Sequence, residues 1–407
     1  MRPASSDRIE ALDVLRALAL FGIIITHAEM GFLAGRAPDP TFDIVSSLDA
    51  GVAEIVRIFA NGKFFSIFSF LFGVSFAIQL QRSSARNGSF AARFAWRLTL
   101  LFVIGAVHNL FFSGDILTVY ALLGLLLIPL HRIDTRVLMV CAALLLFNVP
   151  GIISGLTRSN APAPSAQQQQ AASAMRAAGL DSAKRQLSIK QHGTVTDVVS
   201  MNLNESFTGK LSFQIATGRL FVTFGCFLLG ICAWRAQLFA DSQRNRRVMR
   251  QLVLWAGIPA ALTSVLMWLY PSGMRLESAA QLFPFVISCV QQVALATFFV
   301  AGALLMYWNS SSQGWLSKLA PMGKMGLTTY LMQTVFGLLV FYGFGLGLLG
   351  RIGVATCVAL GIAFFICQIF IARWWMQRYN QGPVEWLWRS ATDRRFQALL
   401  RPQGEPA

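Results

Sequence analysis

The chain contains 407 residues, of which 55% are hydrophobic and only 13% are charged. Since a soluble domain carries about 25% charged residues, this composition excludes an ordinary soluble protein and favours a membrane protein with many apolar segments. The formal net charge of +16 is high enough to suggest nucleic-acid binding, but the cations gather at the ends of the apolar segments, where they direct membrane topology. We therefore expect no nucleic-acid partner.

Ten apolar segments follow one another along the chain and predict an all-α, polytopic membrane helix bundle of about ten transmembrane helices. They cover residues 15–34, 62–80, 97–112, 116–130, 137–156, 213–234, 251–270, 281–308, 325–346 and 353–375. Lys and Arg are concentrated in alternate connections, beginning with the N-terminal one. This asymmetry favours an even number of spans with both termini in the cytoplasm.

One connection on the outer side is much longer than the others. Residues 157–212 contain the low-complexity run APAPSAQQQQAASA and predict a flexible periplasmic loop. This loop separates an N-terminal half of five helices (1–156) from a C-terminal half of five helices (213–390), which a cytoplasmic tail (391–407) follows.

The first apolar segment carries three ionisable side chains. Arg16 and His27 are eleven residues apart, which places them within roughly 20° of one helical face and about 16 Å apart along the axis. Asp13 can pair with Arg16 across one turn. Ionisable groups at membrane depth tend to be functional, so we predict that Arg16 contacts an anion and that His27 accepts a proton from a hydroxyl or amine. The alternative is that Arg16 only extends its charged end to the membrane surface and that His27 is an interfacial residue that hydrogen-bonds a neighbouring helix.

A second candidate site lies in the stretch HNLFFSGDILTVYALLG, residues 108–124. A tight turn at Ser113 and Gly114 should bring Asp115 back toward His108, so that the carboxylate orients the imidazole as a base. The alternative role of Asp115 is a helix N-cap. Tyr120 lies one turn further along and is a candidate substrate contact.

Two more polar residues in apolar segments are candidate substrate contacts. Lys63 stands at the outer entrance of the second segment, and Gln333 lies within the ninth. Interhelical hydrogen bonding is the alternative explanation for Gln333. The six cysteines form no CxxC pair, and the chain has no Walker A loop and no HExxH motif, so we predict no metal site and no nucleotide hydrolysis.

Five motifs in a fixed order carry a resemblance to a known family. They are LDVLRALALFGIII, GKFFSIFSFLFGVSFAIQLQR, GDILTVYALLGLLLIP, LTTYLMQT and GPVEWLWR. With them the chain resembles the YeiB-like bacterial inner-membrane proteins, whose C-terminal region is domain of unknown function 418. The resemblance covers nearly the whole chain except 157–210, and it implies a multi-pass protein of the bacterial inner membrane with the lipid bilayer as its surroundings.

The YeiB-like family is in turn distantly similar to transmembrane acyltransferases. Those proteins carry a basic residue, ten residues and then a His on their first span, and Arg16 and His27 match that spacing. The similarity implies contact with acyl-CoA for Arg16, and acyl transfer or general-base catalysis for His27. YeiB-like chains often carry Asn at the position of His27, which leaves His108 with Asp115 as the alternative catalytic pair.

These observations favour one function and keep others open. We expect a membrane-embedded acyltransferase that moves an acyl group from cytoplasmic acyl-CoA to a hydroxyl or amine of a small-molecule or glycan acceptor at the outer face. The alternative is a transporter or exporter of a small molecule without chemistry, and a structural membrane partner is a third class. The sequence leaves the acyl group, the acceptor and the oligomeric state open.

Overall fold

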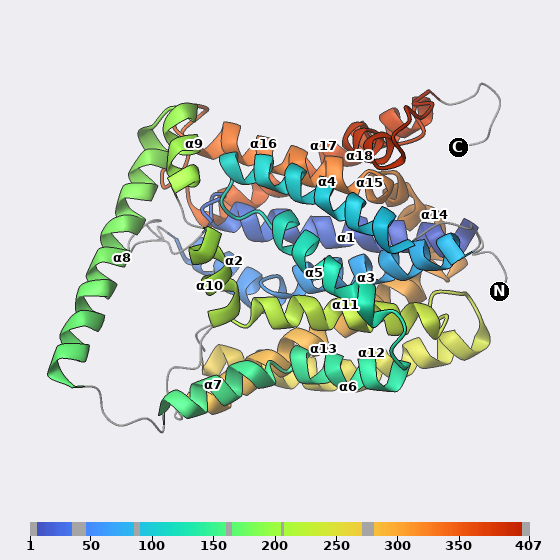
Figure 1. Ribbon diagram of the computed structural model, residues 1–407, viewed down its shortest axis with the longest axis horizontal. Helices are drawn as coiled ribbons and strands as arrows, with labels where there is room; N and C mark the ends of the chain where they lie inside the picture. The colour runs from blue at the N-terminus through green and yellow to red at the C-terminus, as the bar shows by residue number, and fades with distance from the viewer. Residues whose placement is uncertain are drawn as a thin grey trace.

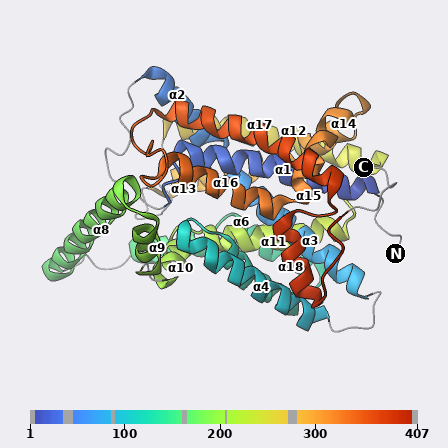
Figure 2. The ribbon, with the colours of Figure 1, turned by 90° about the horizontal axis from the view of Figure 1, so that it is seen from above.

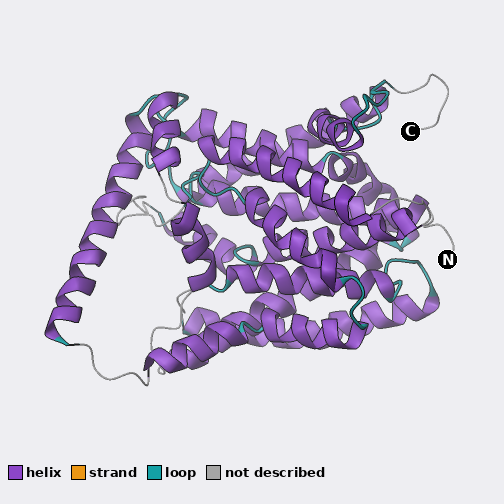
Figure 3. Ribbon diagram, in the orientation of Figure 1, coloured by secondary structure: helices purple, strands orange, loops and turns teal. Residues whose placement is uncertain are grey.

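The fold is an elongated bundle of roughly parallel helices (Figure 1). The computed structural model describes residues 6–34, 46–84, 90–159, 165–204, 207–270 and 281–400. These residues form helices and connecting turns, with one isolated bridge between Tyr379 and Leu400 (Figure 3). The prediction of an all-α bundle is therefore confirmed for the described part of the chain.

The helices follow one another with mostly short connections. They are α1 (Ser6–Glu29), α2 (Ser47–Phe59), α3 (Lys63–Ser84), α4 (Phe90–Phe111), α5 (Leu117–Leu130), α6 (Thr135–Leu146), α7 (Val149–Ser159), α8 (Ala166–His192), α9 (Val195–Asn204), α10 (Phe207–Ala216), α11 (Arg219–Arg235), α12 (Gln243–Leu269), α13 (Leu282–Tyr307), α14 (Ser310–Leu316), α15 (Ala320–Lys324), α16 (Gly326–Phe341), α17 (Val354–Arg378) and α18 (Pro383–Asp393).

Each of the ten predicted apolar segments overlaps one helix or one bent helix pair. By length and composition, six helical stretches of the described chain can cross a membrane, and up to eight can if each bent pair counts as one span. Helices α5 and α16 are also apolar but have only 14 and 16 residues. Helix α2 was not predicted as an element.

Helix α1 lies at the centre of the bundle, against α3, α15, α16 and α17. Helix α11 packs between α3 and α6, so the predicted N-terminal and C-terminal halves interlock. Glycines bring α3 and α11 into backbone contact, because a Cβ at Gly73 would lie only 2.0 Å from the carbonyl oxygen of Phe227. Small residues at such crossings are the usual basis of helix packing in lipid.

Two of the membrane helices are broken, and the breaks touch each other. The axis bends by 45° between α6 and α7, and by 72° between α10 and α11. Gly218, at the second break, has φ +71°, and a Cβ there would lie 1.9 Å from Nδ2 of Asn148 at the first break. Only glycine fits this left-handed, tightly packed position.

The described part of the long connection between the two predicted halves is mostly helical rather than an irregular loop. Residues 157–212 contain α8, α9 and part of α10, and α8 projects away from the bundle at the end opposite α18 (Figures 1 and 2). A capping box formed by Ser165 and Gln168 begins α8. The C-terminal end of α8 is attached to the bundle, because the Gln191 side chain donates to the carbonyl oxygen of Leu349 at 3.1 Å.

Candidate functional site

A single cavity of about 1290 Å³ runs along the inside of the bundle. At the end near α18 its lining is rich in cations, namely Arg16, Arg82, Arg93, Arg97, Lys324 and Arg389. At the opposite end, near α10, its lining includes His27, Gln214 and Arg219. The cavity therefore joins a basic mouth to a smaller polar chamber.

Helix α18 forms one wall of the basic mouth. The guanidinium of Arg97 lies over the ring of Trp388, 3.9 Å from its centroid, and the Trp388 indole N–H donates to the Arg97 carbonyl oxygen at 2.9 Å. Arg93 forms an ion pair with Asp393. Since the other basic side chains outnumber the acidic ones there, this mouth favours anions.

Glu385 holds α18 in place against α16. Its carboxylate accepts hydrogen bonds from the backbone N–H groups of Leu327 (2.7 Å) and Thr328 (3.0 Å) and from the Thr328 hydroxyl (2.5 Å). These N–H groups belong to the first turn of α16 and have no acceptor within the helix. Burial raises the pKa of the Glu385 carboxyl above its ordinary value, although the hydrogen bonds from Thr328 and Leu327 oppose that shift.

Arg16 faces the cavity from α1. Its guanidinium forms an ion pair with the buried Asp13, as predicted from their spacing, and it donates to the Ser75 hydroxyl at 2.9 Å. Both Arg16 and Asp13 line the cavity. The pair fixes the direction of the guanidinium, which is therefore oriented before any ligand arrives.

The middle of the cavity is aromatic. Tyr120 is almost fully buried and its ring lies 5.3 Å from that of Phe72 and 6.2 Å from that of Phe68. The Tyr120 hydroxyl shares a 2.6 Å hydrogen bond with Ser69. All of these rings line the cavity, so the two polar ends are separated by a largely apolar passage.

His27 lies at the end of that passage opposite the basic mouth, in the last turn of α1. Its ring is half-buried and packs edge-on against Phe112, with centroids 5.2 Å apart, and against Phe32 at 5.5 Å. His27 lines the cavity, and Arg219 lies within electrostatic range of it. An imidazole in this position can exchange a proton with a molecule in the chamber.

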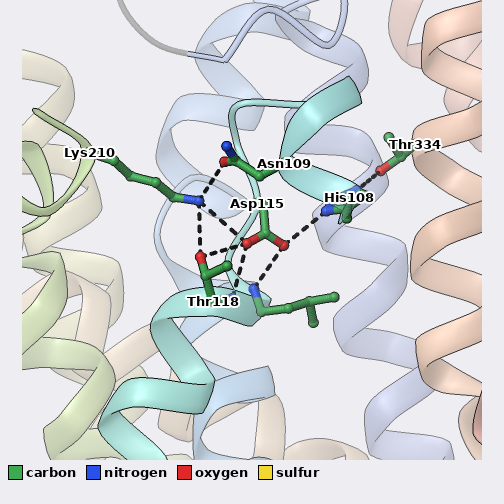
Figure 4. Close-up of polar contacts among 7 residues, drawn as sticks. His108, Asn109, Asp115, Thr118, Lys210 and Thr334 are labelled. Carbon is green, nitrogen blue, oxygen red and sulfur yellow. Dashed lines mark hydrogen bonds and ion pairs between the residues drawn. The ribbon is translucent and has the colours of Figure 1, made fainter. Parts of the chain in front are cut away.

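His108 and Asp115 meet as their spacing predicts, in a buried cluster beside the chamber (Figure 4). The His108 Nδ1 and the Asp115 Oδ1 are 2.9 Å apart, and the His108 Nε2 lies 2.9 Å from the Thr334 hydroxyl. With Nδ1 protonated, Nε2 accepts from Thr334 and both ring nitrogens are occupied. The pair therefore links α4, α5 and α16.

The same carboxylate caps α5 and binds α10. Asp115 accepts from the backbone N–H groups of Leu117 and Thr118, both at 3.0 Å, and from the Thr118 hydroxyl at 2.7 Å. Lys210 of α10 lies 3.4 Å from Asp115 Oδ2 and donates to Asn109 at 2.9 Å. Burial raises the pKa of Asp115, but the His108 hydrogen bond and the Lys210 charge outweigh it, so the pKa lies below its ordinary value of 3.8.

The predicted site residues divide into two groups. Asp13, Arg16, His27 and Tyr120 line the cavity, whereas His108, Asp115, Lys63 and Gln333 are not among its lining residues. Lys63 is buried and its ammonium lies 3.4 Å from the Arg57 carbonyl oxygen.

Gln333 makes interhelical hydrogen bonds, as the alternative explanation for this residue expects. The Gln333 amide donates to the Leu20 carbonyl oxygen and to Gln368, both at 3.2 Å, and so ties α16 to α1 and α17. Among the described residues, no group of three or more His, Cys, Asp or Glu side chains is placed to hold a metal ion.

Four residues that shape the site were not singled out from the sequence: Lys210, Gln214, Arg219 and Glu385. Lys210 and Arg219 could have been recognised in the sequence. They are cations at the end of the bundle opposite the basic mouth, where the distribution of Lys and Arg predicts few of them. Gln214 and Glu385 gave no comparable signal, since their partners are distant in the chain.

Comparison with known proteins assigns the C-terminal region to a family. Residues 233–395 match the family described as "Protein of unknown function (DUF418)". The chain is 29% identical to "Uncharacterized protein YxaH" of Bacillus subtilis (strain 168) over 409 residues, which cover 98% of this chain and 97% of that protein. It is 26% identical to "Uncharacterized protein YeiB" of Escherichia coli (strain K12) over 405 residues, covering 95% and 97%.

Proposed function

Since the chain is a YeiB-like protein whose residues 233–395 form the DUF418 region, we propose that it is a transmembrane acyltransferase. One observation supports this proposal most strongly: a single cavity is lined by a cluster of cations at one end and by His27 at the other. An acyl-CoA donor needs a site for its phosphates and a separate place where the thioester reacts, and this cavity offers both.

The proposal includes a membrane orientation. We place the basic mouth, the start of α1 and α18 in the cytoplasm, and α8 with the His27 chamber on the outer side. This orientation follows the excess of Lys and Arg at the mouth. It uses all ten apolar helices or helix pairs as spans, with the short α5 and α16 among them, and it puts the protein in the bacterial inner membrane.

Donor binding would use the cations of the mouth. The phosphates of acyl-CoA would bind near Arg93 and Arg97, and Arg16 would contact the arm that carries the thioester deeper into the bundle. Along α1, Arg16 and His27 are about 16 Å apart. The aromatic passage around Tyr120 suits the apolar acyl chain.

The chemistry would take place beside His27. Its neutral imidazole removes the proton from the hydroxyl or amine of the acceptor, whose oxygen or nitrogen attacks the thioester carbonyl carbon. The carbon–sulfur bond then breaks, and the imidazolium returns the proton to the departing CoA sulfur. The products are the acylated acceptor and free CoA, so atoms and charges balance.

His27 suits the role of base better than His108 does. The His108 ring nitrogens are both engaged, by Asp115 and Thr334, and the ring does not border the cavity. His108 would then act with Asp115 to hold the outer ends of α4, α5 and α16 around the chamber.

The first test is donor binding to the purified full chain in dodecyl maltoside. We expect acetyl-CoA or a longer acyl-CoA to raise the melting temperature in a saturable way, because a ligand that binds only the native state stabilises it by mass action. Arg16→Ala should abolish the shift. Arg136→Ala, which removes an exposed arginine outside the cavity, is the matched control and should preserve it.

The second test separates binding from chemistry. His27→Ala should keep the acyl-CoA shift but lose the release of free thiol that the wild-type chain produces with an active acceptor. The proposal is wrong if no acyl-CoA shifts the melting of a folded wild-type chain, or if Arg136→Ala removes the shift as completely as Arg16→Ala.

The bent helices favour a second candidate function, transport of a small molecule. Discontinuous membrane helices such as α10 and α11 form substrate sites in many transporters. A transporter would move its substrate into proteoliposomes with unchanged mass. An acyltransferase would instead generate an acylated product, which mass spectrometry of the same vesicles distinguishes.

A further inference from the structure

The break between α10 and α11 brings a cation to the outer end of the cavity. Arg219 is the first residue of α11 and lines the same cavity as His27. Its guanidinium carbon is 5.8 Å from the ring centroids of both Phe65 and Phe213. Aromatic rings beside a guanidinium lower the local dielectric, which strengthens the attraction between this cation and any anion in the chamber.

Gln214 is a second, independent polar group at the same place. It is only 8% exposed, it lines the cavity, and its Oε1 has no hydrogen-bond partner among the described residues. A buried amide oxygen without a partner is costly and rare in native proteins. A hydrogen-bond donor on a bound molecule would satisfy it.

The buried cluster around Asp115 determines where Gln214 lies. Gln214 follows Lys210 by four residues, so both side chains occupy one face of α10. The contacts of Lys210 with Asp115 and Asn109 fix that face against the bundle. These contacts fix the orientation of α10, so the Gln214 side chain remains in the lining of the chamber.

The electrostatics of this end favour an anion. Among the described residues, the acidic side chains that line the cavity are Asp13, Glu385 and Asp393, and all three lie toward the basic mouth. The Asp115 carboxylate beside the chamber is already bound by His108 and Lys210. The N-terminus of α11 adds a partial positive charge at the chamber, and its N-cap is Gly218, which has no side chain to cap the first amides. Half-helix N-termini inside membranes contact anionic substrate groups in this way.

We propose that the outer chamber binds the acceptor through an anionic group, a carboxylate or a phosphate, on Arg219. Gln214 accepts a hydrogen bond from a hydroxyl or amine of the same molecule. The acceptor class is therefore an acid or phosphate that also carries a hydroxyl or amine. This inference rests on the proposed function for the role of acceptor, whereas the anion site itself does not.

The arrangement also explains how the acceptor would be oriented. Arg219 and His27 line the same cavity, and the charge of Arg219 acts on the His27 imidazole. An anion on Arg219 would therefore leave a neighbouring hydroxyl or amine of the same molecule beside the imidazole. Arg219 acts here as a binding residue, and His27 remains the base.

The test compares two sources of such an anion, using the full chain. sn-Glycerol 3-phosphate serves as the soluble probe, with binding followed by thermal shift in dodecyl maltoside. Nanodiscs containing phosphatidylglycerol and phosphatidylcholine serve as the lipid probe, with the retained lipid counted by native mass spectrometry. Saturable binding of either probe supports the site and identifies whether the anion comes from solution or from the bilayer.

Variants link the binding to the chamber. We expect Arg219→Gln to weaken the preferred probe on the order of ten- to hundredfold, since a charge-assisted hydrogen bond is lost. Gln214→Leu should weaken it by a smaller factor, and Arg219→Lys should restore part of the binding. Arg158→Gln removes an exposed arginine of α7 outside the cavity and should leave binding unchanged.

The inference is overturned if neither probe binds the folded wild-type chain, or if Arg219→Gln binds the probe as tightly as Arg158→Gln does. Arg219→Gln should retain the acyl-CoA shift, because the donor cations lie at the other end. If acyl-CoA does not shift the melting temperature of the wild-type chain but the phosphate probe still binds, the acyltransferase proposal is wrong and the anion site is supported independently.

Discussion

Two apolar helices of the bundle, α5 and α16, have only 14 and 16 residues and begin in similar ways. Each has its first N–H groups bound by a carboxylate, Asp115 for α5 and Glu385 for α16. Asp115 precedes α5 directly, whereas Glu385 comes from α18, 57 residues beyond Thr328. The first cap is local, and the second exists only after the C-terminal helix has docked.

The two carboxylates also differ in their partners. Asp115 is buried and touches two basic side chains, His108 and Lys210, whereas the hydrogen-bond donors of Glu385 are the neutral groups of Leu327 and Thr328. Burial acts on both, yet the pKa of Asp115 is lowered and that of Glu385 is raised. The same capping geometry can therefore stabilise a charge or disfavour it, depending on whether basic side chains contact the carboxylate directly.

The largest effect should follow the loss of Asp115. Asp115→Ala removes the cap of α5, leaves Lys210 without its buried counter-charge and leaves the His108 Nδ1–H without its acceptor, so we expect a loss of roughly 3–5 kcal/mol in the free energy of unfolding. Unfolding by SDS in mixed micelles measures it. Asp197→Ala removes another aspartate cap, an exposed one at the start of α9, and should cost far less. Equal losses in the two variants would contradict the comparison.

Loss of Glu385 should have an intermediate effect. Glu385→Ala leaves the first N–H groups of α16 without their acceptor, which costs about 1–3 kcal/mol. It should also loosen α18, and limited proteolysis of the C-terminal region should reveal that change. Glu385→Gln keeps one acceptor oxygen and serves as the milder control. A proteolysis pattern identical to the wild type would show that α18 docks without this contact.

The two carboxylates should respond to pH in opposite directions. The pKa of Asp115 is lowered, so its stabilising charge is present above pH 3.8 and is lost as the pH falls through the folded pKa. The pKa of Glu385 is raised above 4.5, so the folded state loses stability as the pH rises from 4.5 through the folded pKa.

Melting temperatures between pH 3 and pH 7 check this expectation. The advantage of the wild type over Asp115→Asn should grow as the pH rises, whereas its advantage over Glu385→Gln should shrink. Parallel curves for the two variants would refute the difference in charge environment.

The smallest effects should come from loss of the threonine hydroxyls that donate hydrogen bonds to the two carboxylates. Thr118 donates to Asp115 at 2.7 Å and Thr328 donates to Glu385 at 2.5 Å. Replacement of either Thr by Val keeps the shape and removes two hydrogen bonds, for about 1 kcal/mol each, since Thr118 also accepts from Lys210 at 3.2 Å and Thr328 also accepts from the Val384 N–H at 3.1 Å. Thr118→Val should cost more, because the second bond of Thr118 comes from a charged ammonium and that of Thr328 from a neutral amide. The reverse order would indicate that Lys210 finds another partner.

The sequence was most informative where the signal is local. Runs of apolar residues located the long apolar helices of the described chain, and the seven-residue spacing of His108 and Asp115 across a Ser-Gly turn predicted their contact. Arg16 and Asp13 likewise pair as neighbours on one helical face. These features depend on chain geometry over one or two turns.

What the sequence did not reveal depends on distant parts of the chain. The hydrogen bonds of Glu385 to the start of α16 and the contact of Lys210 with Asp115 join residues far apart in sequence. No pattern in the sequence around Glu385 or Lys210 indicates these partners. Helix α8 was predicted as a flexible loop because its composition is polar and repetitive. That composition lacks a hydrophobic face, but its Gln and Ala residues still form a helix readily.

The cavity that joins the basic mouth to His27 has a consequence for cell energetics. In the proposed orientation, an anionic group that moves along it from the cytoplasm travels with the membrane potential, which is negative inside. A full unit of charge gains about 2.3 kcal/mol per 100 mV across the whole membrane thickness. Respiration would therefore help to keep an anionic acceptor in the outer chamber, because movement of its charge through the cavity to the mouth would run against the potential, and a de-energised membrane would remove that restraint.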